Sequence, residues 1–488
     1  MNPEALLEIL NKIQNQKCET QTLENKSANK GCPKRLYDTL SSFSNQDDGG
    51  IIVFGVNEEK GYSEDGVYDA QDLQKQINNQ CLEMESKVHP LLTVAERDGV
   101  CFVSAEIPGI DITERPCYYR GKGRVSGSYV RCGDSDEPMT EYEVYSYEAF
   151  RKKYQDDIRI VPRATKQTLN ADAIEDYLEK LKKGKAHLAK MSDDAICELM
   201  SVYRNNEITL STIMLFSLYP QAYFPQLCIT AVVVPGNEDG DAGPNGERFL
   251  DNERIEGTIP EMLEQALHFI QKNTRTQTII DQETGKRKDR TDYPMIAVRE
   301  ALLNALVHRD YSIHTEGMPI QVVLYDNRLE IRNPGEIYGR MKIDQLGKVQ
   351  PDTRNPVLAV ALETLKVAEN RYSGIPTIRR EIEEYNLAAP EFRNERGSFT
   401  VILYKERAAA GEARPKESSP VVLHQAEILA FCKEPRSKKD IAALLNIKTV
   451  SYAYKMYILP LIENGLLQRT IPENERSHMQ QFYTPTAK

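Results

Sequence analysis

Glu300 and Asn304 lie four positions apart in an otherwise apolar run, Arg299-Glu-Ala-Leu-Leu-Asn-Ala-Leu-Val-His-Arg-Asp-Tyr311. Residues four apart are neighbours on one face of a helix. An amide oxygen at Asn304 can ligate magnesium, and a carboxylate at Glu300 can polarise a water molecule. The spacing therefore predicts one half of a metal and nucleotide site. The alternative is an amphipathic helix whose two polar residues form structural hydrogen bonds.

A second set of acidic side chains lies near the start of the chain. Glu19, Glu24 and Lys26 are close in sequence, and Glu58 directly follows the apolar segment Ile51–Val56. Three carboxylates that meet in space can hold Mg or Mn and activate a water for phosphodiester cleavage, while a lysine neutralises the phosphate. We therefore interpret Glu19, Glu24 and Glu58 as candidate catalytic and metal-binding residues, with Lys26 beside them. The alternative is a group of ordinary solvated acids in an acidic chain.

A basic segment follows in the same part of the sequence. It contains five cations and no acid, with tyrosines between them: Arg115, Arg120, Lys122, Arg124 and Arg131. Cations bind phosphates and flat rings stack on bases, so the segment indicates contact with RNA or single-stranded DNA. A solvated hairpin explains it equally well. The formal charge of −11 argues against indiscriminate coating of nucleic acid and requires local basic patches.

Downstream of Glu300 and Asn304, the sequence predicts the elements that would complete a nucleotide site. Residues 321–331 read as two strands around the turn Asp326-Asn327, followed at once by Asn333-Pro-Gly335. Ser373-Gly374 precedes a helical run over 377–385, whose N-terminus offers backbone amides to an anion. A long helix is expected over 259–272 ahead of this region.

Together these segments resemble the GHKL-type ATP-binding fold over about residues 255–405. The resemblance assigns Glu300 and Asn304 to the metal-and-water helix, Asn333 and Gly335 to the adenine-contacting turn, and Ser373-Gly374 to the second glycine box. It implies ATP as ligand, with Asn304 also a metal ligand. The family usually has aspartate where this chain has Asn333. An amide oxygen can still accept a bond from the adenine amino group, with less charge assistance.

Residues 15–145 resemble the Schlafen AlbA-like domain, through Glu-x-x-x-x-Glu-x-Lys and the later Ser-Asn-x-Asp-Asp-Gly-Gly-x-x-x-x-Gly-Val. In active members the matching acids cleave RNA, tRNA especially, with a divalent metal. The resemblance makes Glu19 and Glu24 the helix-side acids and Glu58 the third acid. The chain departs from the family at Glu58, where aspartate is usual, and at Asn25, where an aromatic residue is preferred. Both resemblances imply a homodimer.

The predicted fold is a multi-domain α+β chain with a Schlafen AlbA-like domain, a GHKL-like α/β sandwich and a winged-helix domain. We predict domains at 1–150, 151–254 (a connecting α/β region) and 255–405, a linker at 406–420, and a winged helix at 421–488. The last is expected to bind nucleic acid through Lys438, Lys439 and Lys455, although a winged helix can equally contact protein.

The 488 residues contain no apolar run long enough for a membrane span, and the first residues lack a secretion signal, so we expect a cytoplasmic protein. The leading hypothesis is a metal-dependent endoribonuclease on structured RNA, regulated by ATP, with a stress or antiphage role by analogy only. The alternative is a non-catalytic, ATP-binding DNA-binding transcriptional regulator. A scaffold that binds nucleotide and proteins alone is a weaker third option.

Overall fold

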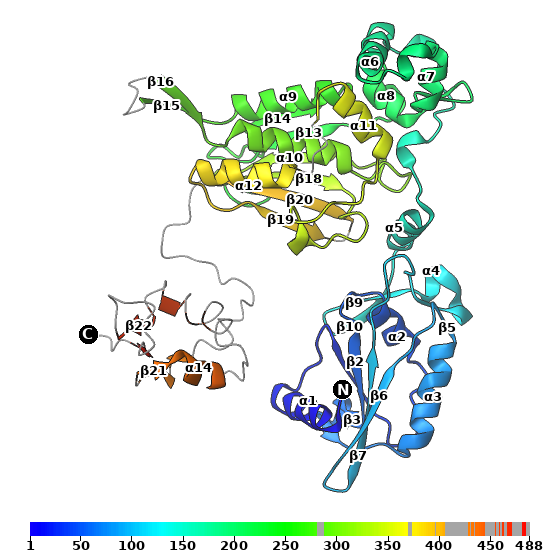
Figure 1. Cartoon of the computed structure of the whole chain (residues 1–488), viewed down its shortest axis with the longest axis vertical. Helices are drawn as coiled ribbons and strands as arrows, with labels where there is room; N and C mark the ends of the chain where they lie inside the picture. The colour runs from blue at the N-terminus through cyan, green and yellow to red at the C-terminus, as the bar shows by residue number, and fades with distance from the viewer. Residues whose placement is uncertain are drawn as a thin grey trace. The chain divides into compact units, whose positions relative to one another are not determined.

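The structure is a computed structural model of the chain (Figure 1). It describes residues 1–280, 287–368, 373–395, 397–405, 428–429, 431–433, 435–444, 454, 458, 461–462, 466–470 and 481–484. Met1–Arg407 and Ala408–Lys488 form two separate compact units. None of the helices in the described parts of the chain combines the length and the apolarity needed to cross a bilayer.

The first part of the larger unit is built on a four-stranded sheet in the order β1-β2-β7-β6. The strands are β1 (Leu23–Lys26), β2 (Gly50–Phe54), β7 (Val100–Ile107) and β6 (Leu91–Arg97), and only β1 and β2 run parallel. Alternation along β2 sends Val53 to one face and Phe54 to the other, as the pleat of a strand requires.

Helices cover both faces of this sheet. Helix α1 (Pro3–Gln16) packs Leu6 and Leu10 against Val53, whereas α2 (Tyr37–Ser44) and α3 (Ala70–Leu82) bury Phe43 and Ile77 against the opposite face (Figure 1). The remaining elements are β3 (Val56–Asn57), β4 (Ser63–Glu64), β5 (Met84–Glu85), β8 (Tyr118–Tyr119), α4 (Gly123–Gly127), β9 (Tyr129–Cys132), β10 (Ser135–Pro138) and α5 (Glu141–Lys152). Glu58–Lys60 is a short 3-10 helix directly after β3.

A six-stranded sheet forms the second core of the unit, in the order β14-β13-β17-β18-β20-β19. Its strands are β14 (Asp251–Ile255), β13 (Ile229–Val233), β17 (Ile320–Leu324), β18 (Arg328–Pro334), β20 (Ser398–Tyr404) and β19 (Glu391–Glu395). Only β13 and β17 are parallel neighbours. The predicted hairpin at 321–331 is confirmed, because β17 and β18 pair directly around Asp326-Asn327.

Helices α9 (Ile259–Lys272), α10 (Met295–His308), α11 (Pro356–Thr364) and α12 (Gly374–Glu384) belong to the same core, and α10 packs against α9, α12 and β18 (Figure 1). Helix α9 begins at the predicted residue because Thr258 and Glu261 form a capping box. The other elements of this part are α6 (Ala171–Gly184), α7 (Asp193–Leu199), β11 (Tyr203–Arg204), β12 (Glu207–Ile208), α8 (Leu210–Phe216), β15 (Thr276–Ile280) and β16 (Arg287–Thr291).

In the smaller unit the described elements are β21 (Arg436–Ser437), α14 (Lys438–Leu444), β22 (Gln468–Arg469) and β23 (Gln481–Tyr483). The strands pair in the order β21-β23-β22 around a small core that includes Ile441 and Phe482. The predicted helix over 449–463 falls largely outside the described residues, so the winged helix stays a prediction.

Candidate nucleotide and nucleic-acid sites

One cleft in the middle of the larger unit is lined by all six residues that the sequence predicted to bind nucleotide. They are Glu300, Asn304, Asn333, Gly335, Ser373 and Gly374. They come from α10, the end of β18 and the start of α12, segments that are separated along the chain and meet only in the fold. The cleft measures about 1310 Å³, including the space that opens to solvent, and most of its remaining wall is apolar.

The polar end of the cleft lies where α10 meets α12. A β-carbon at Gly374 would come within 2.9 Å of Asn304 Nδ2 and 3.3 Å of Glu300 Oε2, so glycine is what allows the two helices to approach. Helix α12 begins at Gly374, and the first amides of a helix have no partner within it. Amides and a positive helix end beside an amide oxygen and a carboxylate suit a phosphate with its magnesium ion.

The other end of the cleft is the turn after β18. Asn333 is buried, and its side-chain Nδ2 donates to the carbonyl oxygen of Pro334 at 3.3 Å. Gly335 has φ +101°, and a β-carbon there would come within 2.9 Å of the Asp310 β-carbon. Only glycine meets both requirements without strain.

A buried ion pair holds this turn in place. Asp310 is 1 % exposed; its carboxylate contacts Arg354 Nη1 at 2.6 Å and accepts from the Tyr142 hydroxyl of α5 at 2.9 Å. Burial alone would raise the pKa of Asp310, but the Arg354 charge and the hydrogen bonds lower it. The carboxylate is therefore ionised and braced behind Gly335. No local sequence pattern indicates a role for Arg354 or Tyr142.

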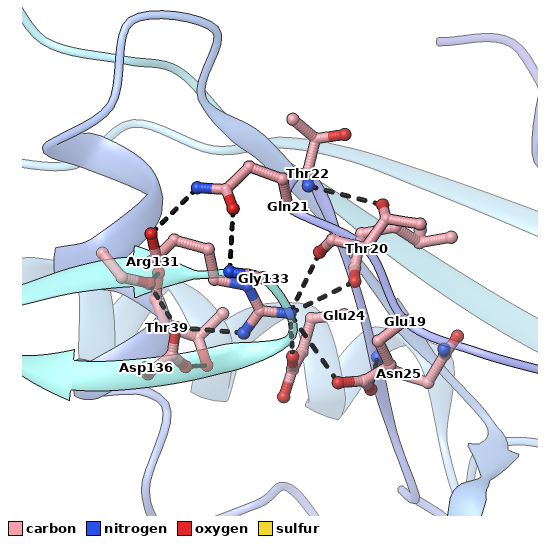
Figure 2. A network of polar contacts seen from close by, with 12 residues as sticks. Glu19, Thr20, Gln21, Thr22, Glu24, Asn25, Thr39, Arg131, Gly133 and Asp136 are labelled. Atoms are coloured by element: carbon pink, nitrogen blue, oxygen red, sulfur yellow. Dashed lines mark hydrogen bonds and ion pairs between the residues drawn. The ribbon is translucent and has the colours of Figure 1, made fainter. Parts of the chain in front are cut away.

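In the first part of the chain, Glu19 and Glu24 meet around one arginine (Figure 2). Arg131 Nη2 lies 2.8 Å from Glu24 Oε2 and 3.7 Å from Glu19 Oε2, and Arg131 Nη1 lies 3.1 Å from Asp136 Oδ1. Lys26 forms an ion pair with Glu24 from the same strand. Glu24 lies on strand β1 and Glu19 in the segment between α1 and β1, so neither acid is on a helix, which corrects the placement that the resemblance implied.

The two glutamates compete for ionisation. Burial, and to a smaller extent a hydrogen bond with Glu24, raises the pKa of Glu19 to about 8. The hydrogen bond that Glu19 Oε1 accepts from the Asn25 amide at 2.7 Å acts in the opposite direction and lowers this pKa. Glu58 adds only a longer-range repulsion and instead accepts a 3.3 Å hydrogen bond from Tyr62.

Among the residues that the structure describes, no group of three or more His, Cys, Asp or Glu side chains is placed to hold a metal ion. Glu19 and Glu24 lie together, but Glu58 does not complete a three-acid group with them, and the guanidinium of Arg131 lies between the first two. The metal site of Glu19, Glu24 and Glu58 therefore stays a prediction.

The basic segment splits into buried and exposed members. Arg131 is 1 % exposed, and Arg115 is 8 % exposed and pairs with Asp47 at 2.7 Å. Their predicted role as surface contacts to nucleic acid is corrected, because both side chains are buried and already form ion pairs within the protein. Arg124 pairs with Glu148, whereas Arg120 and Lys122 are exposed. Arg120 also donates to the carbonyl of Glu83 at the end of α3, at 3.3 Å.

Around Lys122 lies a cluster that the sequence analysis only partly identified. We call it the Tyr37 patch, and it consists of Arg35, Tyr37, Tyr119, Lys122 and Tyr129. The Tyr37 and Tyr119 rings stack at 4.5 Å with 13° between their planes. Lys122 Nζ lies 4.8 Å from the centre of the Tyr37 ring, and the guanidinium of Arg35 lies 5.6 Å from it. A basic run before α2, Lys30 to Arg35, was the missed signal.

In the smaller unit, Lys438 and Lys439 lie on α14, and Lys438 Nζ is 5.3 Å from the centre of the Tyr454 ring. Lys455 lies outside the described residues. Their contact with nucleic acid stays a prediction.

Two sequence families match this chain. Residues 19–140 match the family described as Schlafen, AlbA_2, and residues 317–403 match the family described as putative ATP-dependent DNA helicase recG C-terminal. The first match includes the acids around Arg131 and the Tyr37 patch. The second includes Asn333, Gly335, Ser373 and Gly374 and begins after α10, so Glu300 and Asn304 lie outside it. Both expected resemblances are thereby confirmed.

No curated protein matches the chain. Among solved structures, it is similar to the DIP2311 protein from Corynebacterium diphtheriae, with 16% identity and a TM-score of 0.41 over 99% of this chain and 97% of that one. It is also similar to the N-terminal domain of a putative ATP-dependent DNA helicase RecG-related protein from Nitrosomonas europaea. That match has 26% identity and a TM-score of 0.23 over 28% of this chain and 93% of that one.

Proposed function

We propose that the protein is a nucleic-acid-binding regulator that binds ATP with Mg²⁺ in the cleft between α10, β18 and α12, and that it does not cut nucleic acid. The observation that carries the proposed ATP binding is that six residues from three separate sequence motifs line one cleft. The nucleic-acid half is supported by the match of residues 19–140 to the Schlafen AlbA_2 family and by the exposed cations of the Tyr37 patch.

In this proposal each cleft residue has one task. Asn304 ligates the magnesium ion through its side-chain oxygen, and the N-terminus of α12 receives the phosphates close to it. Asn333 accepts a hydrogen bond from the adenine amino group, while Gly335 lets the base approach the backbone. Glu300 is placed to polarise a water if the nucleotide is hydrolysed.

Calorimetric titration of ATP into the full chain tests the nucleotide half. We expect Asn304→Ala to weaken ATP binding about 10- to 100-fold in magnesium, because a hydrogen bond or ligand contact to a charged group contributes roughly 1.5–3 kcal/mol. The mutant should also lose the difference between magnesium and EDTA. Asn252→Ala, at an exposed position of β14, is the matched control and should bind like the wild type. Unchanged affinity and magnesium dependence in Asn304→Ala would remove the assignment.

The non-catalytic half rests on the acids of the first domain. Glu24 forms ion pairs with both Arg131 and Lys26, and Glu19 lies 3.7 Å from the same guanidinium, so the acids are built into a buried ion network. Metal-dependent phosphodiester cleavage needs ionised carboxylates that are open to a cation.

Incubation with tRNA and with duplex DNA, in magnesium and in manganese, distinguishes non-catalytic binding from nuclease activity. We expect both substrates to stay intact and to be retained in a salt-sensitive complex. Metal-dependent cutting that is lost in Glu24→Gln would instead establish the nuclease.

We also propose that the chain forms a homodimer, as both resemblances imply. Sedimentation equilibrium should give twice the single-chain mass of 55.5 kDa. A single-chain mass at every concentration would exclude the dimer.

A further inference from the structure

The rings of the patch are engaged within the protein. Tyr37 and Tyr119 stack on one another at 4.5 Å, nearly parallel, so each ring gives one face to the other. The Lys122 ammonium lies 4.8 Å from the centre of the Tyr37 ring, and a β-carbon at Gly121 would lie 2.6 Å from the Tyr119 ring. Both side chains are partly buried and Tyr129 is buried, so the patch offers a nucleobase little open ring surface to stack on.

The rings act on the lysine instead. Lys122 Nζ donates to the Tyr129 hydroxyl at 3.0 Å and lies 4.8 Å from the centre of the Tyr37 ring. A hydrogen bond and a cation–π contact at these distances hold an ammonium in place without neutralising it. No ion pair joins Lys122 to an acid among the residues that the structure describes, and the side chain is exposed. The result is a fixed, charged donor directed to solvent.

Arg35 extends the same surface. Its guanidinium is 64% exposed and lies 5.6 Å from the centre of the Tyr37 ring, with Asp38 as a nearby counter-charge at 2.7 Å. Lys34 precedes it and is also exposed. Two cations therefore lie beside the Tyr37 ring and a third lies next to them in the sequence, and their positive charge is complementary to a run of phosphates.

We infer that the Tyr37 patch binds the sugar-phosphate backbone of a nucleic acid and does not stack its bases. This inference rests on the proposed nucleic-acid binding and specifies its mode. It replaces the base-stacking role that the interspersed tyrosines suggested. Binding through this patch is independent of base identity and open to single and double strands alike.

An abasic strand provides the decisive comparison. Fluorescence anisotropy with the full chain should give affinities within about twofold for a 20-nucleotide strand and for an abasic strand of the same length and charge. Stacking contributes roughly 1–3 kcal/mol per base, so a stacking surface would bind the abasic strand at least about fivefold more weakly for each base held.

A lysine substitution locates the contact. Lys122→Gln should weaken binding to all sequences alike and reduce the slope of log K against log salt by about 0.9 for duplex DNA and about 0.7 for the single strand. Lys12→Gln removes the same charge from α1, which covers the opposite face of the sheet from α2, and should leave the slope unchanged.

The outcomes are distinguishable. Strong preference for the strand with bases, or an unchanged slope in Lys122→Gln while binding persists, overturns the inference and leaves the proposed function standing. Absence of salt-sensitive binding to any of these strands overturns both, and directs attention to an acidic protein as partner of the patch.

Discussion

Replacing Arg131 by methionine tests whether the acids of the first domain form a structural network. Methionine keeps much of the apolar stem but removes a guanidinium that is 1 % exposed and lies 2.8 Å from Glu24 and 3.1 Å from Asp136. Those carboxylates are only 6 % and 10 % exposed, so both would be left buried without their main counter-charge. Removal of one partner from a buried ion pair costs about 3–5 kcal/mol. Because Lys26 still pairs with Glu24, we expect the lower end of this range.

Hydrogen exchange monitored by mass spectrometry measures this loss of stability in the full chain. A cost of about 3 kcal/mol corresponds to roughly 100-fold faster exchange in peptides from β1 and β2. Arg35→Met is the matched control, since its ion pair with Asp38 involves an arginine that is 64% exposed and contributes at most about 1 kcal/mol. Exchange in Arg131→Met within a factor of about ten of that control would refute the reasoning.

Two further predictions concern Glu19 and Gly374. Because the native pKa of Glu19 is about 8 against an ordinary 4.5, the folded state holds a proton that the unfolded state releases, and the stability of the first domain should fall as pH rises from about 4.5 to about 8. Glu19→Gln should flatten this dependence in urea unfolding followed by exchange of the β1 and β2 peptides; an equally steep profile would contradict it. Gly374→Ala should weaken ATP binding at least about tenfold by calorimetry, because the added β-carbon would lie 2.9 Å from Asn304 Nδ2. Gly184→Ala is the control, since the space around Gly184 is open, and it should bind ATP like the wild type. Equal ATP affinities of the two variants would contradict a role for the close approach of Gly374 to Asn304.

The residues that line the cleft between α10, β18 and α12 could be predicted largely from the sequence, because their signals are local. The spacing of Glu300 and Asn304 follows from helical periodicity, and Gly335 and Gly374 mark places where a side chain cannot fit. What supports the cleft had no such signal. Asp310 is held by Arg354 and by Tyr142, which is far away in the sequence, and no spacing rule links a tyrosine in α5 to a turn after β18.

The acids of the first domain show where residue type alone misleads. Glu19, Glu24 and Lys26 were correctly grouped, but the sequence counted Arg131 as a surface cation because it lies among other basic residues. The fold places Arg131 elsewhere: β9 carries it beside α2, where its guanidinium is 5.2 Å from the centre of the Phe43 ring and meets Glu24 from β1 and Asp136 from β10. Strand pairing and burial, which local patterns do not encode, bring this arginine into the acids of the predicted metal site.

The charge of the whole chain restricts how the Tyr37 patch can work. A net charge of −11 repels a polyanion at long range, so steering from a distance does not favour encounter. At physiological ionic strength the screening length is about 8 Å, and acids farther away than this act weakly on a phosphate in contact with Lys122. Attraction thus survives only within a few ångströms of fixed cations. A lysine held by the Tyr37 ring and the Tyr129 hydroxyl meets that condition, because its side chain is already fixed and loses little further freedom when it contacts a phosphate.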